Sequence, residues 1–180
     1  MTIPRATCIA IAIVAGPSAV AQSPSPDATC PATINNGLGL ARPVGEPPAG
    51  NHGNDSRTIA TSLPPEGTVT FKPGGPGCVD PDGTLGMKWP WWRGVRGPLI
   101  IEGRRLDGPA GPLRASIPAG YGQTGFQSTG LMFPTSGCWE VTGRVGAESL
   151  TFVAHVMKID AGPATTCPPL GIYERTASRP

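Results

Sequence analysis

The chain has 180 residues, of which 26 are glycine and 23 are proline, and its formal net charge is +2 at pH 7. A charge this close to zero excludes the strong overall attraction to nucleic acid or to a membrane surface that a basic protein would have. The high share of Gly and Pro, with no sustained 3.6-residue periodicity beyond the N-terminal stretch, predicts an all-β fold with long Gly/Pro-rich loops.

The N-terminal 21 residues are predicted to be a signal peptide. Arg5 precedes the apolar stretch from Cys8 to Ala15, and the small-x-small pattern Ala19-Val20-Ala21 marks a cleavage site. The apolar stretch is far shorter than the roughly 20 residues of a membrane span. We therefore expect a product that is secreted or periplasmic, has no membrane span and has no nucleic-acid partner.

The rest of the chain is expected to hold one domain. Residues 22–29, rich in Ser and Pro, are predicted to form a flexible leader, and Arg42 to Gly53 a long loop. Residues 30–160 are long enough for one hydrophobic core and are predicted to form a single β-sandwich domain. Residues 161–180 are expected to be a C-terminal tail that Cys167 ties to this domain.

The cysteine count agrees with export. Removing Cys8 from the five cysteines leaves an even number, namely Cys30, Cys78, Cys138 and Cys167, as expected of two disulfides formed in an oxidising compartment. Their spacing does not select among the three possible connectivities. Neither a metal site nor a cofactor is expected, because no two of these cysteines have the spacing of a metal clip and only His52 and His155 could assist.

Strand-like runs follow one another at short intervals and are separated by turn signals such as Asp80-Pro81-Asp82-Gly83. The runs are Thr58 to Leu63, Gly67 to Phe71, Leu85 to Trp92, Leu99 to Arg104, Leu113 to Ile117, Gly125 to Phe133, Cys138 to Val145 and Leu150 to Ile159. About seven or eight short strands predict an antiparallel β-sandwich or a small barrel. The last run is apolar on both faces, so we expect it to be covered on both, with His155 as a packed core residue.

The run from Leu85 to Trp92 offers the best candidate for a ligand surface. At a period of two, Trp89 and Trp91 share one face of the strand and Trp92 lies on the other. Arginines follow nearby in the sequence at Arg93, Arg96, Arg104 and Arg105. Trp92 and these guanidinium groups could form a basic, aromatic surface that holds a glycan or an anionic peptide outside the cell or in its envelope. Alternatively, the tryptophans fill the core and the arginines lie over them with their charged ends in water.

Catalysis is the least favoured reading of the sequence. Gly125 to Gly130 is not a serine elbow, because Phe126 occupies the place of the first glycine, and Gly74 to Gly77 lacks the lysine and hydroxyl of a phosphate loop. Asp80-Pro81-Asp82-Gly83 is explained by a turn rather than by calcium. A hydrolase would have to be assembled from loop residues around His52, Asp55 and Glu66. We therefore expect no enzyme, and favour a non-catalytic binding or cell-surface module over a structural or accessory domain without a ligand.

Five segments stand out as motifs: Cys30-Pro31-Ala32-Thr33, Pro73 to Gly77, Asp82 to Arg93, Ile101 to Asp107 and Phe133 to Gly146. They resemble a family of uncharacterised exported bacterial proteins, within a match from about Cys30 to Ile159. The resemblance implies an immunoglobulin-like sandwich and a Cys30–Cys138 bridge, which leaves Cys78 to pair with Cys167; it implies no activity. Immunoglobulin spacing, with a tryptophan between two cysteines, offers Cys78–Cys138 as the alternative bridge.

Overall fold

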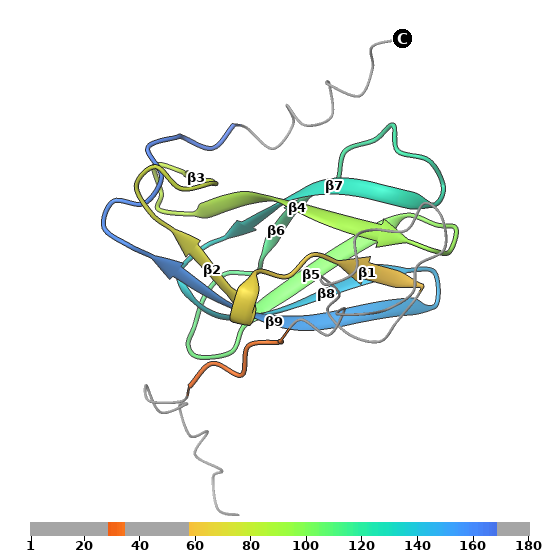
Figure 1. Cartoon of the computed structure of the whole chain (residues 1–180), viewed down its shortest axis with the longest axis horizontal. Helices are drawn as coiled ribbons and strands as arrows, with labels where there is room; N and C mark the ends of the chain where they lie inside the picture. The colour runs from red at the N-terminus through yellow and green to blue at the C-terminus, as the bar shows by residue number, and fades with distance from the viewer. Residues whose placement is uncertain (1–28, 35–57, 169–180) are drawn as a thin grey trace, which may run out of the picture.

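A computed structural model describes residues 29–34 and 58–168 of the chain (Figure 1). The predicted signal peptide, most of the leader, the long loop, His52, Asp55 and the end of the tail lie outside these residues. In the described part, the chain forms nine strands and one short 3-10 helix. In chain order they are β1 (Ile59–Thr61), η1 (Pro65–Gly67), β2 (Thr68–Phe71), β3 (Cys78–Val79), β4 (Leu85–Arg93), β5 (Leu99–Arg105), β6 (Arg114–Ser116), β7 (Gly125–Phe133), β8 (Gly137–Val145) and β9 (Glu148–Lys158).

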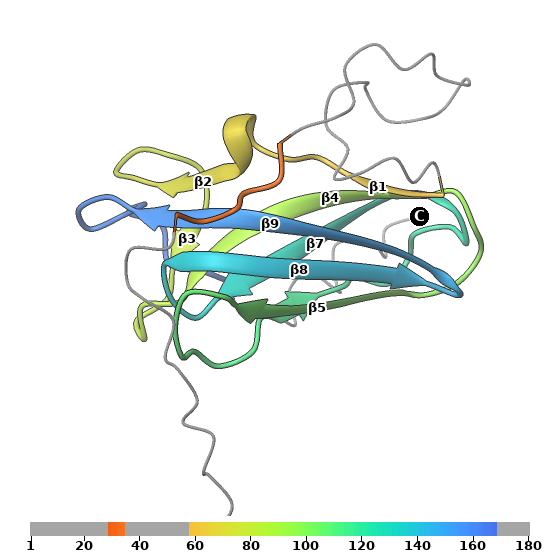
Figure 2. The same cartoon turned by 90° about the horizontal axis from the view of Figure 1, so that it is seen from below.

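The strands form two sheets that face each other, with β4 and β7 in one layer and β8 and β9 in the other (Figures 1 and 2). The first sheet has the order β1-β4-β7-β6, with β3 paired to one end of β4, and the second has the order β2-β9-β8-β5. The all-β prediction is confirmed, and each of the eight predicted runs overlaps one strand. No strand was predicted at β3, because its two residues lie beside Gly-Pro turn segments.

The expectation of a wholly antiparallel sandwich is wrong at one pair of strands. β2 runs parallel to β9, whereas every other pairing in the described residues is antiparallel. The chain leaves the first sheet after β1 and crosses to the second through η1, so that β2 meets β9 running in the same direction (Figure 1). The segment from β1 to β2 therefore contributes an edge strand to each sheet.

Aromatic side chains from both sheets fill the space between the layers. The Trp89 ring stacks on Phe152 with centroids 5.4 Å apart, and Trp139 meets Phe133 edge-on at 5.7 Å. The Trp89 indole Nε1 donates a hydrogen bond to the Thr61 hydroxyl at 2.8 Å, so this polar atom is satisfied inside the core. Together with Trp91, which is also buried, these rings place three of the four tryptophans in the core.

The last strand is covered on one face rather than on both. On β9, Phe152 and Ala154 point into the core, whereas Thr151 is exposed and His155 is half-buried on the outer face. The expectation that His155 is a packed core residue is therefore wrong. The segment 29–34 lies beside this strand, where Thr33 exchanges hydrogen bonds with the backbone of Val153 at 2.8 Å.

Two disulfides hold the ends of the described chain to the sandwich. Cys30 pairs with Cys138 and Cys78 pairs with Cys167, with Cα atoms 5.4 and 4.8 Å apart. The connectivity that the family resemblance implies is confirmed, and so is the attachment of the tail through Cys167. The alternative Cys78–Cys138 bridge is wrong, because Cys138 points outward from the second sheet while β3 carries Cys78 at the edge of the first. Within 29–34 and 58–168, no helix has the length and apolar character of a membrane-spanning segment.

Candidate functional site

Trp92 and Phe126 lie directly opposite each other on the neighbouring strands β4 and β7, on the outer face of the first sheet. Phe126 is 53% exposed, an unusual exposure for so large an apolar side chain in a strand, and Trp92 is half-buried. The Tyr121 ring meets Phe126 edge-on with centroids 6.2 Å apart. We call Trp92, Tyr121 and Phe126 the aromatic cluster.

Local backbone geometry sets the position of the Trp92 ring. Gly125, at the start of β7, has a φ of 90°, a conformation that residues with a side chain rarely adopt. A Cβ at this position would lie 3.8 Å from the Cζ3 atom of Trp92, so the ring extends across the glycine. The cluster therefore occupies the end of the sheet where β4 finishes and β7 begins.

Arg93 does not belong to this outer surface. It follows Trp92 on β4 and thus points between the sheets, where it is 4% exposed. Its Nη1 donates to the carbonyl of Gly97 at 2.8 Å and its Nη2 donates to the carbonyl of Gly122, which places it between two loops. No acidic side chain of the described residues forms an ion pair with it, and burial lowers the pKa of its guanidinium.

The other predicted arginines are also dispersed. Arg96 is exposed in the loop between β4 and β5, whereas Arg104 and Arg105 lie at the far end of β5 in the second sheet. Arg104 forms an ion pair with Glu140 at 2.7 Å on the outer face of that sheet. Arg105 points to the opposite side and donates to the Asp107 carboxylate at 2.6 Å.

The predicted basic, aromatic surface is therefore not present as one patch. The alternation of side chains separates Trp92 from Arg93 and Arg104 from Arg105, and β4 and β5 belong to different sheets. The Arg105–Asp107 pair is structural. Burial raises the pKa of the Asp107 carboxyl, but the hydrogen bonds from Arg105 and from the Cys138 backbone outweigh burial and hold the pKa below its usual value of 3.8.

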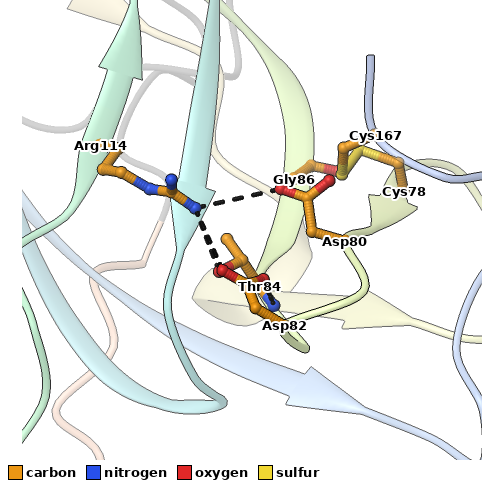
Figure 3. The surroundings of a disulfide bond; sticks show 7 residues. All are labelled: Cys78, Asp80, Asp82, Thr84, Gly86, Arg114 and Cys167. Carbon is orange, nitrogen blue, oxygen red and sulfur yellow. Dashed lines mark hydrogen bonds and ion pairs between the residues drawn. A yellow bond between two sulfur atoms is a disulfide. The ribbon is translucent and has the colours of Figure 1, made fainter. Parts of the chain in front are cut away.

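An arginine side chain, that of Arg114, approaches the carboxylates of the turn that contains Asp80 and Asp82 (Figure 3). Arg114 extends from β6 until its Nη2 lies 3.9 Å from the Asp80 carboxylate and 3.8 Å from that of Asp82. The backbone N–H of Thr84 donates to Asp82 at 2.9 Å, and this bond lowers the pKa of the Asp82 carboxyl. The Gly83 N–H bonds to the Asp80 carbonyl at 2.8 Å, which identifies the segment as a hydrogen-bonded turn.

The residues considered for a hydrolase are not brought together in the described part of the chain. Glu66 is exposed in η1, while His52 and Asp55 lie outside the described residues. Among the residues that the structure describes, no three His, Cys, Asp or Glu side chains are grouped as metal ligands would be.

Sequence reasoning found Trp92 but missed Phe126 and Tyr121. The exposure of Phe126 could have been predicted from the alternation of side chains along the strand, because Gln127, Thr129 and Leu131 form the opposite, buried face of the same run. Tyr121 gave no such signal, since it lies in a loop whose position depends on Arg93. No protein-family model, no curated protein and no solved structure matches the chain.

Proposed function

We propose that this protein is an exported, non-catalytic binding module with an immunoglobulin-like sandwich, and that the aromatic cluster is its ligand surface. The two disulfides support export, because such bonds persist in oxidising compartments. The cluster supports binding, and its only titratable side chain is that of Tyr121. The motifs resemble those of an uncharacterised exported bacterial family with this kind of domain, and membership of that family would agree with the proposal.

Strand order supports the immunoglobulin-like assignment. If β1 and β2 are taken as two parts of strand A, and β4 to β9 are lettered B to G, then one sheet reads A-B-E-D and the other contains C-F-G. These are the two sheets of the constant-type immunoglobulin domain. The core differs from antibody domains, since an aromatic stack and not a disulfide joins the sheets.

The observation that carries the binding proposal is the exposure of Phe126 directly opposite Trp92. A large aromatic side chain on a strand normally lies in the core, and here one is more than half exposed beside two further rings. Burial of these rings against a ligand would remove apolar surface from water, which is favourable at about 25 cal/mol per Å².

The dispersal of the arginines favours a neutral glycan as the ligand class, with Arg96 in the β4–β5 loop as the one predicted arginine that is exposed and forms no ion pair with the described residues. Arg93 is enclosed, and Arg104 and Arg105 are bonded to acidic side chains, so these three guanidinium groups are engaged elsewhere. The C–H faces of a sugar ring can instead pack on the aromatic rings. Gln123 and Thr124, which are exposed in the loop that follows Tyr121, can supply hydrogen bonds to hydroxyl groups.

A glycan array tests this proposal. We expect the oxidised protein to bind a set of neutral glycans, and Trp92→Ala and Phe126→Ala to reduce that binding at least tenfold. The matched control is Ile100→Ala, because Ile100 is 51% exposed on the outer face of the second sheet and should leave binding unchanged. If the parent binds no glycan, or if all three variants bind as the parent does, the proposal is wrong and an accessory role without a ligand is favoured.

A further inference from the structure

One edge of β4 is incompletely paired. On one side the whole strand pairs with β7, from Leu85 to Arg93. On the other side β1 pairs only with residues 91–93 and β3 only with residues 85–86. Within the described residues, the four positions from Met87 to Pro90 therefore face no neighbouring strand on this side.

Backbone groups of this gap point away from β7. The Pro90 carbonyl accepts a hydrogen bond from the Thr61 hydroxyl at 2.7 Å, so it is directed toward β1 and the gap. Because backbone groups alternate in direction along a strand, the N–H and C=O of Lys88 point to the same side. Pro90 has no N–H to donate, so a further strand added at this edge could form a pair of backbone hydrogen bonds only at Lys88.

A groove lies beside these groups. It has a volume of about 370 Å³ and is lined by Met87–Pro90 of β4, by Thr68–Thr70 of β2, which is an edge strand of the second sheet, and by Ser62–Pro64, the segment that follows β1. A second hollow of about 400 Å³ lies beside the Cys78–Cys167 disulfide, and the two share Pro76, Met87 and Lys88 as walls. We call these two neighbouring hollows together the edge groove.

The walls of the edge groove are mainly apolar, and Lys88 is the only charged side chain among the residues that line it. An ammonium group at the side of an apolar channel favours a ligand with a carboxylate at the matching position. A channel that also presents a backbone donor and acceptor pair is suited to an extended chain, which gains main-chain hydrogen bonds while alternate side chains enter the channel.

We propose that the edge groove binds an extended segment of another protein, apolar in composition and with one acidic side chain that pairs with Lys88. The segment adds a short strand to the open edge of β4 and exchanges hydrogen bonds with the Lys88 backbone. This site is separate from the aromatic cluster. Trp92 lies beyond the residues that line the groove, at the end of β4 where β1 is paired.

A displayed library of random heptapeptides, selected on the oxidised protein, tests this inference. We expect the selected peptides to be extended, apolar sequences with one Asp or Glu. The most enriched peptide should bind Lys88→Glu at least tenfold more weakly than the parent. Lys72→Glu is the matched control, since Lys72 is exposed at the end of β2 and does not line the groove.

Amide chemical shifts locate the bound peptide and also report whether Lys88→Glu is folded. We expect the Lys88 amide to shift and the Phe126 amide to stay in place. Three results would overturn the inference: no peptide is enriched, the enriched peptides bind Lys88→Glu as tightly as the parent, or their shifts centre on Phe126. A concentration-dependent shift of Lys88 without peptide would also overturn it, because a second copy of the chain would then be the occupant.

Discussion

The Nη2 atom of Arg93 donates a hydrogen bond to the carbonyl of Gly122, the residue that follows Tyr121 in the chain. Arg93 is enclosed between the sheets, whereas Trp92 beside it points outward. Two consecutive residues of β4 therefore have linked roles. Trp92 supplies one ring of the aromatic cluster, and Arg93 holds the loop that carries a second ring, that of Tyr121. Order in the cluster depends on this interior guanidinium.

Substitution of Arg93 should show that geometry matters more than charge. In Arg93→Lys a charge stays buried but a single ammonium cannot reach the carbonyls of both Gly97 and Gly122, so we expect a loss of about 1–3 kcal/mol in the free energy of unfolding. Arg93→Met should cost less, because it removes the buried charge and leaves two carbonyls in loops that water can reach. Urea denaturation measures both values.

The pH dependence of the lysine variant provides its control. A buried lysine has a pKa below its unfolded value of roughly 10.4, so the unfolded chain binds more protons and stability should rise with pH up to that value. Arg93→Met should show no such rise relative to the parent. If Arg93→Lys is as stable as the parent at pH 7, the two loop hydrogen bonds do not hold the structure as described.

A second prediction concerns the close approach of Gly143 on β8 to Trp91 on β4. A Cβ at Gly143 would lie 2.4 Å from the Cζ3 atom of Trp91, a ring that is buried and cannot move aside. Gly143→Ala should therefore lower the free energy of unfolding by about 1–3 kcal/mol. Gly111→Ala is the control, since nothing lies within 4 Å of its added methyl group. Equal stability of the two variants would refute the packing of Trp91.

Glu66 offers a substitution that should stabilise the protein. Its φ of 56° and ψ of 19° are left-handed, and a residue with a Cβ is strained there. Glu66→Gly should relieve this strain and raise the free energy of unfolding by about 0.5–1 kcal/mol, after the greater freedom of glycine in the unfolded chain is subtracted. Thermal and urea unfolding measure the gain. If Glu66→Ala, which keeps the Cβ, is equally stabilising, the backbone explanation fails.

The Arg105–Asp107 pair predicts a defined acid sensitivity. The folded pKa of Asp107 lies below its usual 3.8, so its stabilising contribution is present above that pH and is lost as the pH falls through the lowered value. At pH 7, Asp107→Asn should lower the free energy of unfolding by about 1 kcal/mol or less, because the pair is partly exposed. At a pH where the Asp107 carboxyl of the parent is protonated, the substitution should not change the free energy of unfolding. A double-mutant cycle with Arg105→Met isolates the pair; a cost that is the same at pH 7 and pH 2 would exclude the assigned linkage.

The strands were predictable because their signals are local. Alternation from Trp139 to Val145 and turn residues such as Pro81 and Gly83 fix where strands begin, end and face. The parallel pairing of β2 with β9 was not predictable, since it depends on how the chain crosses between sheets at η1. The disulfides followed from a resemblance and not from spacing.

The outward direction of Trp92 and of Phe126 was predictable from the alternation of side chains along each strand, but their position opposite each other was not. Consecutive side chains of a strand point to opposite faces, so the alternation along β4 already places Trp92 and Arg93 on different faces. We nevertheless predicted one surface for both because they are neighbours in the sequence. Arg104 and Arg105 seemed near Trp92 because the number of intervening residues is small, whereas β5 lies in the other sheet. Phe126 joins Trp92 through the register of β4 with β7, which no local pattern encodes.

The most direct test of the central claim is the 19F NMR spectrum of protein labelled with 5-fluorotryptophan, titrated with the neutral glycans that the array selects. The chain has four tryptophans, and the three in the core serve as internal controls for Trp92. We predict that the Trp92 resonance, assigned with Trp92→Phe, shifts in proportion to occupancy while those of Trp89, Trp91 and Trp139 stay unchanged. A bound glycan that leaves the Trp92 resonance in place would contradict the assignment of the aromatic cluster as the ligand surface.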